Sequence, residues 1–299
     1  MREKLRDLWK EIKKNRESYL LILPYFTLFF VFVVIPVIIA IVLSFTNYNI
    51  IQAPKFIGWG NYKRLFLEDD VFLIALQNTF KFALITGPLS YFACLLFAWL
   101  INELSPKVRS VLTLLFYAPA LSSSVFFIWI YIFSGDIYGL LNGILINLGI
   151  IKEPIYWLQD SNINLYVLMV IQLWMSLGTS FLAFIAGFQT IDRSLYEAGA
   201  VDGIKNRWQE LWYITLPSMK PQLIFGAIMQ VTASFAVADI SATLIGFPSP
   251  LYSAHTIVLH MWDYGNIRYE MGYASAIAVI LFLITVLINQ GVRKIIRPD

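Results

Sequence analysis

The sequence predicts an all-α, polytopic membrane protein with six transmembrane helices, and three observations support this prediction. The chain is 59% hydrophobic and only 14% charged, with a mean hydropathy of +0.69, whereas an ordinary soluble domain carries about 25% charged residues. Six apolar runs are long enough to cross a bilayer. The basic residues also lie mainly on one side of these runs. A small soluble domain or a disulfide-bonded scaffold is therefore excluded.

The six apolar runs define the expected spans. A helix that crosses a hydrocarbon core about 30 Å thick needs about 20 apolar residues at about 1.5 Å each. The runs of this length are residues 19–45, 82–101, 111–133, 165–190, 223–247 and 272–289. Prolines inside the runs are tolerated because neighbouring helices satisfy the backbone groups that they free. These prolines are Pro24, Pro36, Pro88 and Pro119.

The positions of Lys and Arg predict the orientation. Cytoplasmic loops carry an excess of Lys and Arg. One side of the spans carries 16 of the 22 basic residues, in segments 1–18, 102–110, 191–221 and 290–299. The other side carries the remaining six, in loops 46–81, 134–164 and 248–271. We therefore expect both termini in the cytoplasm, and we attribute the net charge of +3 to membrane topology and not to nucleic-acid binding.

The chain divides into a short N-terminal segment and one membrane domain. Residues 1–18 predict a cytoplasmic, amphipathic helix on the membrane surface. The apolar run that follows is some 27 residues long, too long for a signal peptide, and no small-residue cleavage site follows it. Residues 19–299 are expected to form the six-helix domain. The cap loop (residues 134–164) contains several glycines and is expected to form an ordered cap of short helices.

The polar loop (residues 191–221) interrupts this apolar chain with charges and glycines. Ser194 and Glu197 fit a capping box, in which the serine closes a helix start and the glutamate bonds back to it. A helix is therefore predicted to begin at Ser194. Gly203 is predicted to end it, because glycine takes the left-handed conformation found at helix ends.

A second short helix is predicted over residues 204–213. Trp208, Leu211 and Trp212 would share one apolar face of it, and residues 215–217 (Thr-Leu-Pro) would end it. An ordinary connection between spans explains these local signals. A partner on the cytoplasmic face explains in addition the unusual length of the loop and its exposed apolar face.

Particular residues of the polar loop carry a resemblance to a known family. Glu197-Ala198-Gly199, then Asp202-Gly203, then Ile214-Thr215-Leu216-Pro217 resemble the EAA loop in the membrane subunits of binding-protein-dependent ABC importers. Other runs resemble the sugar branch of that family, the maltose and glycerol-3-phosphate type permeases. These runs are FIGWGNYKRLF (56–66), Asn78-Thr79, YGLLNGILINLGI (138–150), LWMSLGTSFLAFIAGFQTI (173–191) and MGYASAIAVILFLI (271–284).

The resemblance implies a fold, a function and a set of partners. The fold would be that of a type I ABC importer permease in the cytoplasmic membrane of a bacterium or archaeon. The chain would be a non-catalytic subunit of an ATP-driven carbohydrate importer, which forms half of the pathway and couples ATPase closure to alternating access. Its implied partners are a second homologous permease, two ATPase subunits, an extracytoplasmic sugar-binding protein and a saccharide. ATP and Mg would bind to the ATPase and no cofactor to this chain, which contains no G-x-x-x-x-G-K-[ST] motif.

By the same resemblance, the first helix of the polar loop is a coupling helix that docks on the ATPase. The implied coupling residues are Glu197, Ala198, Gly199, Asp202, Gly203, Leu216 and Pro217. The chain departs from the family pattern at two positions. Gly199 replaces a second alanine, which is expected to cost about 0.5–1 kcal/mol of helix stability and to loosen the helix. Asp192 replaces a common proline and can start a helix equally well.

A polar stripe in the fifth run suggests a substrate path. Gln230, Ser234, Val237 and Ser241 have the spacing of one helix face. Such groups either face a water-filled path or hold helices together, and both interpretations stay open. The resemblance marks as path residues Gln230, Ser234 and Val237 with Trp174, Gly178 and Phe181 of the fourth run. An aromatic ring beside a small residue suits a sugar, and the near absence of basic groups in the spans favours a neutral one.

Asp239 is expected to be the most buried-looking carboxylate, as a substrate contact or part of a proton relay. Pairing with Lys81 and a position that reaches the membrane interface are the alternatives. His255 and His260 are five residues apart and do not share a helix face, so we expect a place in the aromatic belt and no metal site.

Two other function classes fit less well. An ion-coupled secondary transporter of a small polar solute should have several intramembrane carboxylates and repeated halves, and Asp239 is the one candidate. A membrane-embedded enzyme needs a cluster of His, Asp or Glu, which the sequence does not suggest. Cys94 is the single cysteine, so no disulfide can form within the chain.

Overall fold

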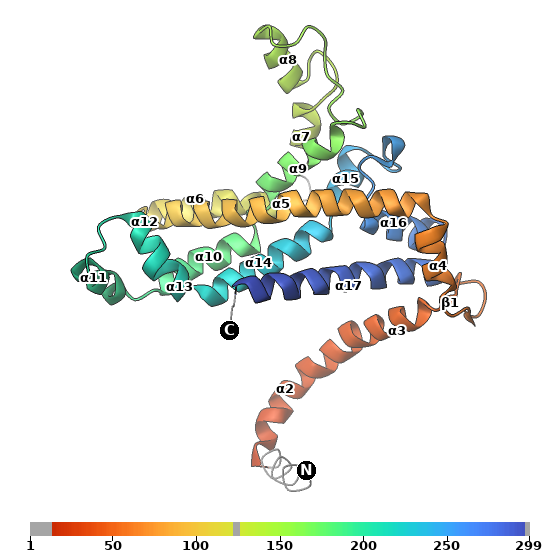
Figure 1. Cartoon of the computed structure of the whole chain (residues 1–299), viewed down its shortest axis with the longest axis horizontal. Helices are drawn as coiled ribbons and strands as arrows, with labels where there is room; N and C mark the ends of the chain where they lie inside the picture. Colours follow the sequence, from red (N-terminus) through yellow and green to blue (C-terminus); the bar gives the residue numbers. More distant parts are fainter. Residues whose placement is uncertain (1–13, 122–125, 297–299) are drawn as a thin grey trace.

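The computed structural model describes residues 14–121 and 126–296. Its N-terminal arm (residues 16–43) is one continuous helical segment that leaves the bundle (Figure 1). The arm consists of α2 (Arg16–Phe29), a π-helical stretch (Phe30–Val34) and α3 (Ile35–Leu43). A small antiparallel hairpin follows, in which Thr46 of β1 (Thr46–Asn47) pairs with Phe56 of β2 (Lys55–Phe56).

The remaining helices form the bundle, the polar loop and the cap loop. The first half contains α4 (Gly60–Leu67), α5 (Asp70–Asn102), α6 (Pro106–Leu121), α7 (Phe126–Ile132), α8 (Leu140–Asn147), α9 (Asn164–Met175) and α10 (Thr179–Thr190). The second half contains α11 (Arg193–Val201), α12 (Arg207–Glu210), η3 (Leu211–Thr215), α13 (Leu216–Ser218), α14 (Lys220–Phe235), α15 (Asp239–Leu244), η4 (Pro250–Tyr252), α16 (Ile257–Trp262), η5 (Asp263–Ile267) and α17 (Met271–Ile296).

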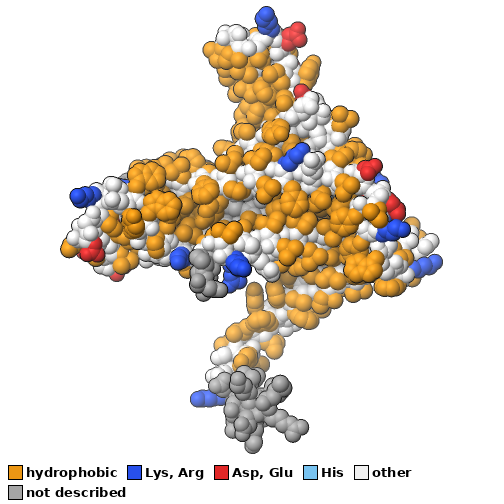
Figure 2. Space-filling view, viewed as in Figure 1, with side chains coloured by type: hydrophobic (Ala, Val, Ile, Leu, Met, Phe, Trp, Pro, Cys, Tyr) orange, Lys and Arg blue, Asp and Glu red, His pale blue; other side chains and the backbone are white. Residues whose placement is uncertain are grey.

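The core of the bundle lies between α5, α10, α14 and α17. The long helix α5 contacts α9, α10 and α14, and α14 also contacts α10 and α17. Small residues let these helices approach closely. A Cβ atom on Gly226 of α14 would lie only 2.4 Å from Phe184 Cζ of α10. Figure 2 shows hydrophobic side chains over most of the bundle surface, with charged side chains mainly at its ends.

Four helical segments of the described residues are long and apolar enough to cross a membrane: 16–43, 70–102, 164–190 and 271–296. A fifth candidate is the pair α6 and α7, whose axes differ by 86° across residues 122–125, which lie outside the described part. The predicted all-helical, multi-pass architecture is confirmed. The third predicted span corresponds to the bent pair α6 and α7. The fourth is interrupted between the end of α9 at Met175 and the start of α10 at Thr179, and the fifth between the end of α14 at Phe235 and the start of α15 at Asp239.

Of the two predicted peripheral segments, residues 1–18 and the cap loop, the structure describes only the cap loop in full. The amphipathic segment 1–18 lies almost entirely outside the described residues. The cap loop contains one helix, α8, and projects away from the bundle (Figure 1). Asn142 organises this loop from a fully buried position. Its Nδ2 donates to the carbonyl oxygens of Ser134 and Ile155, and its Oδ1 accepts from Trp157 Nε1 at 2.9 Å.

Candidate functional site

The first helix of the polar loop is α11, and its start differs from the prediction. Asp192 is the N-cap residue, because its Oδ1 accepts a hydrogen bond from the backbone N of Ser194 at 3.0 Å. This hydrogen bond lowers the pKa of Asp192. The predicted capping box of Ser194 and Glu197 is therefore wrong. Asp192 has extended backbone angles that bring its carboxylate over the free N–H groups of the first turn.

The end of α11 agrees with the prediction. Gly203 follows the helix with φ of +94°, a left-handed conformation that favours glycine. Its backbone N donates to Ala200 O at 3.3 Å, and Ile204 N donates to Gly199 O at 2.9 Å. These hydrogen bonds satisfy carbonyl groups that the helix end would leave free.

The second helix of the polar loop starts later and runs further than predicted. Asn206 caps it by accepting from Gln209 N at 2.9 Å, so α12 begins at Arg207. The chain then stays helical through η3 and α13 to Ser218. The predicted break at residues 215–217 is wrong. The π-helical turn η3 precedes Pro217, which occupies the first turn of α13, where the missing N–H of proline costs little.

Gly199 has a packing role that the sequence did not reveal. It is buried, and a Cβ atom at this position would lie 2.6 Å from Ile214 Cδ1 and 3.0 Å from Ile204 Cδ1. The absence of a side chain therefore lets α11 lie directly against η3. The expectation that Gly199 loosens the helix is wrong, because its neighbours hold it in close contact.

A hydrogen-bonded chain also joins α11 to η3. Thr215 Oγ1 donates to Glu210 O at 3.2 Å, so the Tyr196 hydroxyl, 2.9 Å from Thr215 Oγ1, donates to it. Glu197, Ala198, Asp202 and Pro217 remain exposed, whereas Leu216 is half-buried. The structure thus brings the predicted coupling residues into one compact helical unit. Its surface includes the apolar side chain of Val201, which is 89% exposed.

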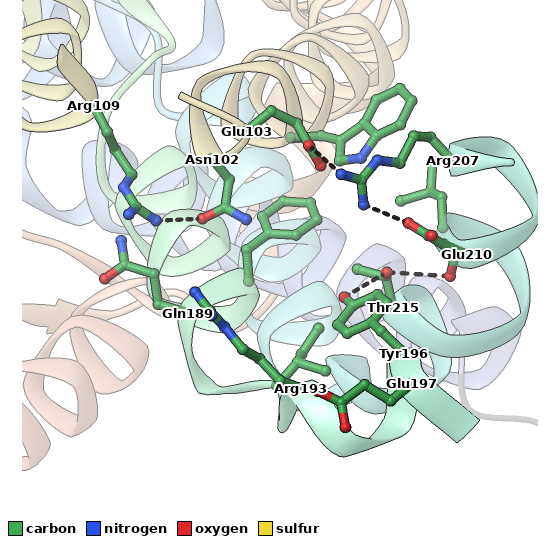
Figure 3. Close-up of a pocket in the computed structure, with 14 residues that line it drawn as sticks. Asn102, Glu103, Arg109, Gln189, Arg193, Tyr196, Glu197, Arg207, Glu210 and Thr215 are labelled. Atoms are coloured by element: carbon green, nitrogen blue, oxygen red, sulfur yellow. Dashed lines mark hydrogen bonds and ion pairs between the residues drawn. The ribbon is translucent and has the colours of Figure 1, made fainter. Parts of the chain in front are cut away.

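A cavity of about 600 Å³ lies between this unit and the adjoining ends of the bundle helices (Figure 3). Arg207 crosses one side of it and pairs with Glu103 at 3.2 Å and with Glu210 at 2.7 Å. Arg109 Nη1 donates to Asn102 Oδ1 at 2.8 Å. The other lining residues are Trp99, Phe188, Gln189, Ile191, Arg193, Tyr196, Glu197, Leu211 and Thr215. No pattern in the sequence indicates this cavity, because its walls come from four separate segments.

Gln230 and Ser234 of the predicted substrate path are buried among helices. Gln230 Nε2 donates to Ser176 O at 3.1 Å and to Cys94 Sγ at 3.2 Å, while Cys94 Sγ donates to Ser176 O at 3.3 Å. Gln230 thus ties α14 to α5 and to the break between α9 and α10. Ser234 Oγ donates to Val231 O of its own helix at 2.9 Å. The Gln230 contacts are those expected of a residue that holds helices together, whereas the Ser234 hydrogen bond stays within α14.

The other predicted path residues lie at different places. Phe181 is fully buried in the core, beside Phe116. Trp174 is 39% exposed and lines a hollow of about 250 Å³. Gln230 and Ser234 line another hollow, of about 390 Å³.

Gly178 and Val237 hold backbone positions in this region. Gly178 lies in the break that precedes α10, and a Cβ there would be 3.4 Å from Ala120 Cβ. Val237 is buried, and its carbonyl accepts from Thr256 Oγ1 at 2.7 Å.

Asp239 is exposed at the start of α15, so the expectation of a buried carboxylate is wrong. The interruption after α14 turns this residue away from the core. Asp239 forms no ion pair with Lys81 within residues 14–121 and 126–296. Among the residues that the structure describes, the buried carboxylates are those of Asp69 and Asp263.

A buried polar network at the end of the bundle opposite the polar loop was missed by the sequence analysis. His255 and His260 are only 1% and 2% exposed. His255 Nε2 lies 3.2 Å from His260 Nδ1, and His260 Nε2 lies 3.0 Å from Asp69 Oδ2. Tyr273 donates its hydroxyl to the same Asp69 oxygen at 2.7 Å. The predicted aromatic-belt role is wrong, because His255 precedes α16 and the loop folds it back against His260.

The environment of this network shifts two pKa values. Burial opposes the ionisation of Asp69, but hydrogen bonds from His260, Tyr273 and the backbone N of Phe72 outweigh it and lower the pKa. Burial, together with the neighbouring His260, lowers the pKa of His255 to about 4. Within the described part of the chain, no three His, Cys, Asp or Glu side chains are placed to hold a metal ion.

Known proteins resemble this chain over nearly its whole length. The family described as binding-protein-dependent transport system inner membrane component matches residues 95–298. The probable ABC transporter permease protein YesP of Bacillus subtilis (strain 168) is 34% identical over 281 residues, which cover 93% of this chain and 89% of that protein. The arabinooligosaccharides transport system permease protein AraP of the same organism is 28% identical over 285 residues, which cover 94% and 89%.

A solved structure has the same fold. It is a bacterial ABC transporter involved in the import of the acidic polysaccharide alginate, with a TM-score of 0.78 at 22% identity over 98% of this chain and 99% of the other. The predicted permease fold is confirmed, as is the prediction of a permease subunit and not an enzyme, since both relatives are named as permease proteins. The chain belongs to the family of inner membrane components of binding-protein-dependent transport systems.

Proposed function

We propose that this permease is the transmembrane subunit of an ATP-driven importer of saccharides and that its polar loop couples ATPase closure to alternating access. The observation that carries the proposal is the compact unit of α11, α12 and η3. Its two helices are held together at Gly199 and Tyr196, while Glu197 and Ala198 stay exposed on α11. A rigid, exposed helix at a membrane surface can receive force from a partner without unfolding.

The substrate proposal rests on the relatives and on the composition of the spans. The AraP relative is named for arabinooligosaccharides. Basic residues are scarce in the long helices, which favours a neutral saccharide over a phosphorylated one. The path residues proposed are Trp174, Gly178, Phe181, Gln230, Ser234 and Val237, with Asp239 exposed beyond them. Contacts of a saccharide with Gln230 would require the bundle to open between α14 and α9, because its amide is bonded inside the protein.

The partners proposed are a second homologous permease, two ATPase subunits that bind ATP and Mg, and an extracytoplasmic sugar-binding protein. The N-terminal arm supports the second permease. None of its described residues in α2 and α3 is buried, and its main contact with the bundle is that of α3 with α17. We place both termini and the polar loop in the cytoplasm, on the Lys and Arg distribution.

The ion-coupled alternative has less support. It expects several buried carboxylates within the membrane. The four long helical segments of the described residues contain no buried Asp or Glu. A passive permease energised by a separate ATPase needs none.

The coupling role is tested by Gly203→Pro. Proline fixes φ near −65°, whereas Gly203 has φ of +94°, so the substitution displaces α11 from α12. We expect ATP hydrolysis to continue while uptake per ATP falls by about tenfold, as for a lost coupling free energy of about 1.4 kcal/mol. The measurement is uptake and ATP hydrolysis in proteoliposomes that contain the complete importer.

The matched control is Gly149→Pro, which places the same backbone misfit (φ of +71°) in the cap loop. It should leave uptake per ATP unchanged. Normal uptake per ATP by the Gly203→Pro importer would refute the coupling role.

A further inference from the structure

We propose that Trp99 and Trp208, flanked by Glu103 and Arg207, form the joint through which the polar loop moves α5. The inference rests on the proposed function, because it concerns how the force of ATPase closure reaches the spans. Trp99 and Glu103 lie one turn apart at the end of α5, and Arg207 and Trp208 are adjacent in α12. Two contacts therefore join the same two helices side by side.

The geometry of the joint is that of an aromatic contact reinforced by an ion pair. The indole rings have centroids 4.9 Å apart and planes inclined at 58°. Beside them, Arg207 Nη2 lies 3.2 Å from Glu103 Oε2 (Figure 3). The Arg207 and Glu103 side chains are 63% and 40% exposed, so the ion pair alone is weak. Trp208 is 60% exposed and Trp99 is half-buried, so the tryptophan contact is stabilised mainly by the favourable ring geometry.

The joint is the second of two links in a continuous path. The first link holds α11 against η3 through the close contact at Gly199 and the Tyr196 to Thr215 hydrogen bond. Since α12 leads directly into η3, a push on α11 moves both short helices as one body. That body meets the end of α5 at Trp99 and Glu103, which are the residues that a movement must displace first.

Helix α5 is suited to receive this movement. It is 33 residues long and runs as one helix from Asp70 to Asn102. It contacts α9, α10 and α14, so tilting it changes the packing of several bundle helices together. In Figure 1, α12 lies at one end of α5 and α11 extends beyond it. A displacement at that end is carried along the whole bundle.

Replacing either tryptophan by alanine tests the joint. The complete importer, with its ATPase and binding protein, is reconstituted in proteoliposomes, and uptake per ATP hydrolysed is measured with a panel of neutral oligosaccharides. We expect Trp208→Ala and Trp99→Ala each to lower uptake per ATP by about fivefold or more. The double variant should be no worse than the stronger single variant, because both changes remove the same contact. Trp208→Phe should retain most of the coupling.

The control is Leu89→Ala, which removes an exposed apolar side chain of α5 that lies away from the polar loop and should leave uptake per ATP unchanged. Co-purification of the ATPase with each variant reports assembly separately. Unchanged uptake per ATP in both tryptophan variants would overturn the joint, as would additive losses in the double variant or a loss of ATPase binding. A wild-type importer that assembles but performs no ATP-driven saccharide uptake would instead refute the proposed function.

Discussion

Gly199 shows how one missing side chain determines the shape of the polar loop. By helix propensity alone, glycine at this position weakens α11. In the folded protein, its surface is the point of closest approach between α11 and η3. The relevant quantity is therefore the space between two elements that are 15 residues apart in the sequence, and propensity carries no information about that space.

Gly199→Ala is expected to destabilise the protein by about 1–3 kcal/mol despite the better helix propensity of alanine, because the added Cβ would meet Ile214 Cδ1 at 2.6 Å. Thermal unfolding of the purified protein measures the change. Adding Ile214→Val removes the nearest methyl group and should restore most of the loss. A Gly199→Ala variant as stable as the wild type would contradict the packing role.

The buried His255 predicts a pH dependence of stability. In the unfolded chain its pKa returns to about 6.5, whereas burial and His260 lower it to about 4 in the folded protein. Between these pH values only the unfolded chain binds the proton, so the free energy of unfolding decreases as the pH falls from about 6.5 to about 4. Asp69, whose pKa is lowered by folding, adds a further loss in more acidic solution, below its ordinary pKa of 3.8.

Melting temperatures measured from pH 7 to pH 4 test this expectation. His255→Asn removes the titrating group and should flatten the decrease over that range. Equal slopes for the wild type and His255→Asn would show that the imidazole does not contribute.

At the scale of elements, the sequence predicted the helices better than their interruptions. The length of the apolar runs located the start of α17 and the end of α5 closely, because a membrane span needs only length and hydrophobicity, but α5 begins at Asp70, before the predicted start at residue 82. The runs did not locate the break before α10 or the gap between α14 and α15. Those interruptions are held by distant partners, such as Gln230 at Ser176 and Thr256 at Val237. No local sequence pattern predicts such contacts.

Gln230→Ala tests the bridge that holds the first of these interruptions. The substitution removes the hydrogen bond from α14 to Ser176 O, which keeps the Gly178 N donor at 2.7 Å and the Cys94 thiol, and we expect a loss of about 0.5–1.5 kcal/mol in unfolding free energy. Uptake should weaken while ATPase assembly persists. Met229→Ala, one residue away on the exposed side of α14, is the matched control. Equal melting temperatures for the two variants would contradict a stabilising role of the Gln230 hydrogen bond.

At the scale of the whole molecule, the multi-pass helical architecture was predictable, but contacts between ends of helices were not. The distribution of Lys and Arg predicts which loops are cytoplasmic, and the EAA-like residues of the polar loop predict the family. The cavity beside Arg207 and the network at Asp69 join segments 100 or more residues apart. Their existence depends on how the helices are arranged, which hydropathy alone does not specify.

The N-terminal arm makes a prediction about assembly. Leu21 is 83% exposed on α2, none of whose residues is buried. A photo-reactive amino acid at this position should crosslink to the second permease when the complete importer is assembled, as detected by mass spectrometry. The same residue at Phe92 of α5 is the comparison. Capture of lipid alone at Leu21, in a verified complete importer, would contradict our placement of the second subunit.

The bonded thiol in the centre of the bundle has a practical consequence for spectroscopy. Cys94 is the single cysteine of 299 residues, is fully shielded from solvent and donates its hydrogen to Ser176 O. Maleimide dyes and nitroxide spin labels should therefore not react with the Cys94 thiol of the folded wild-type protein. Cysteines introduced one into α11 and one into α5 become the only two reactive thiols of this subunit. Distances between the two helices can be followed during turnover without first removing a natural residue.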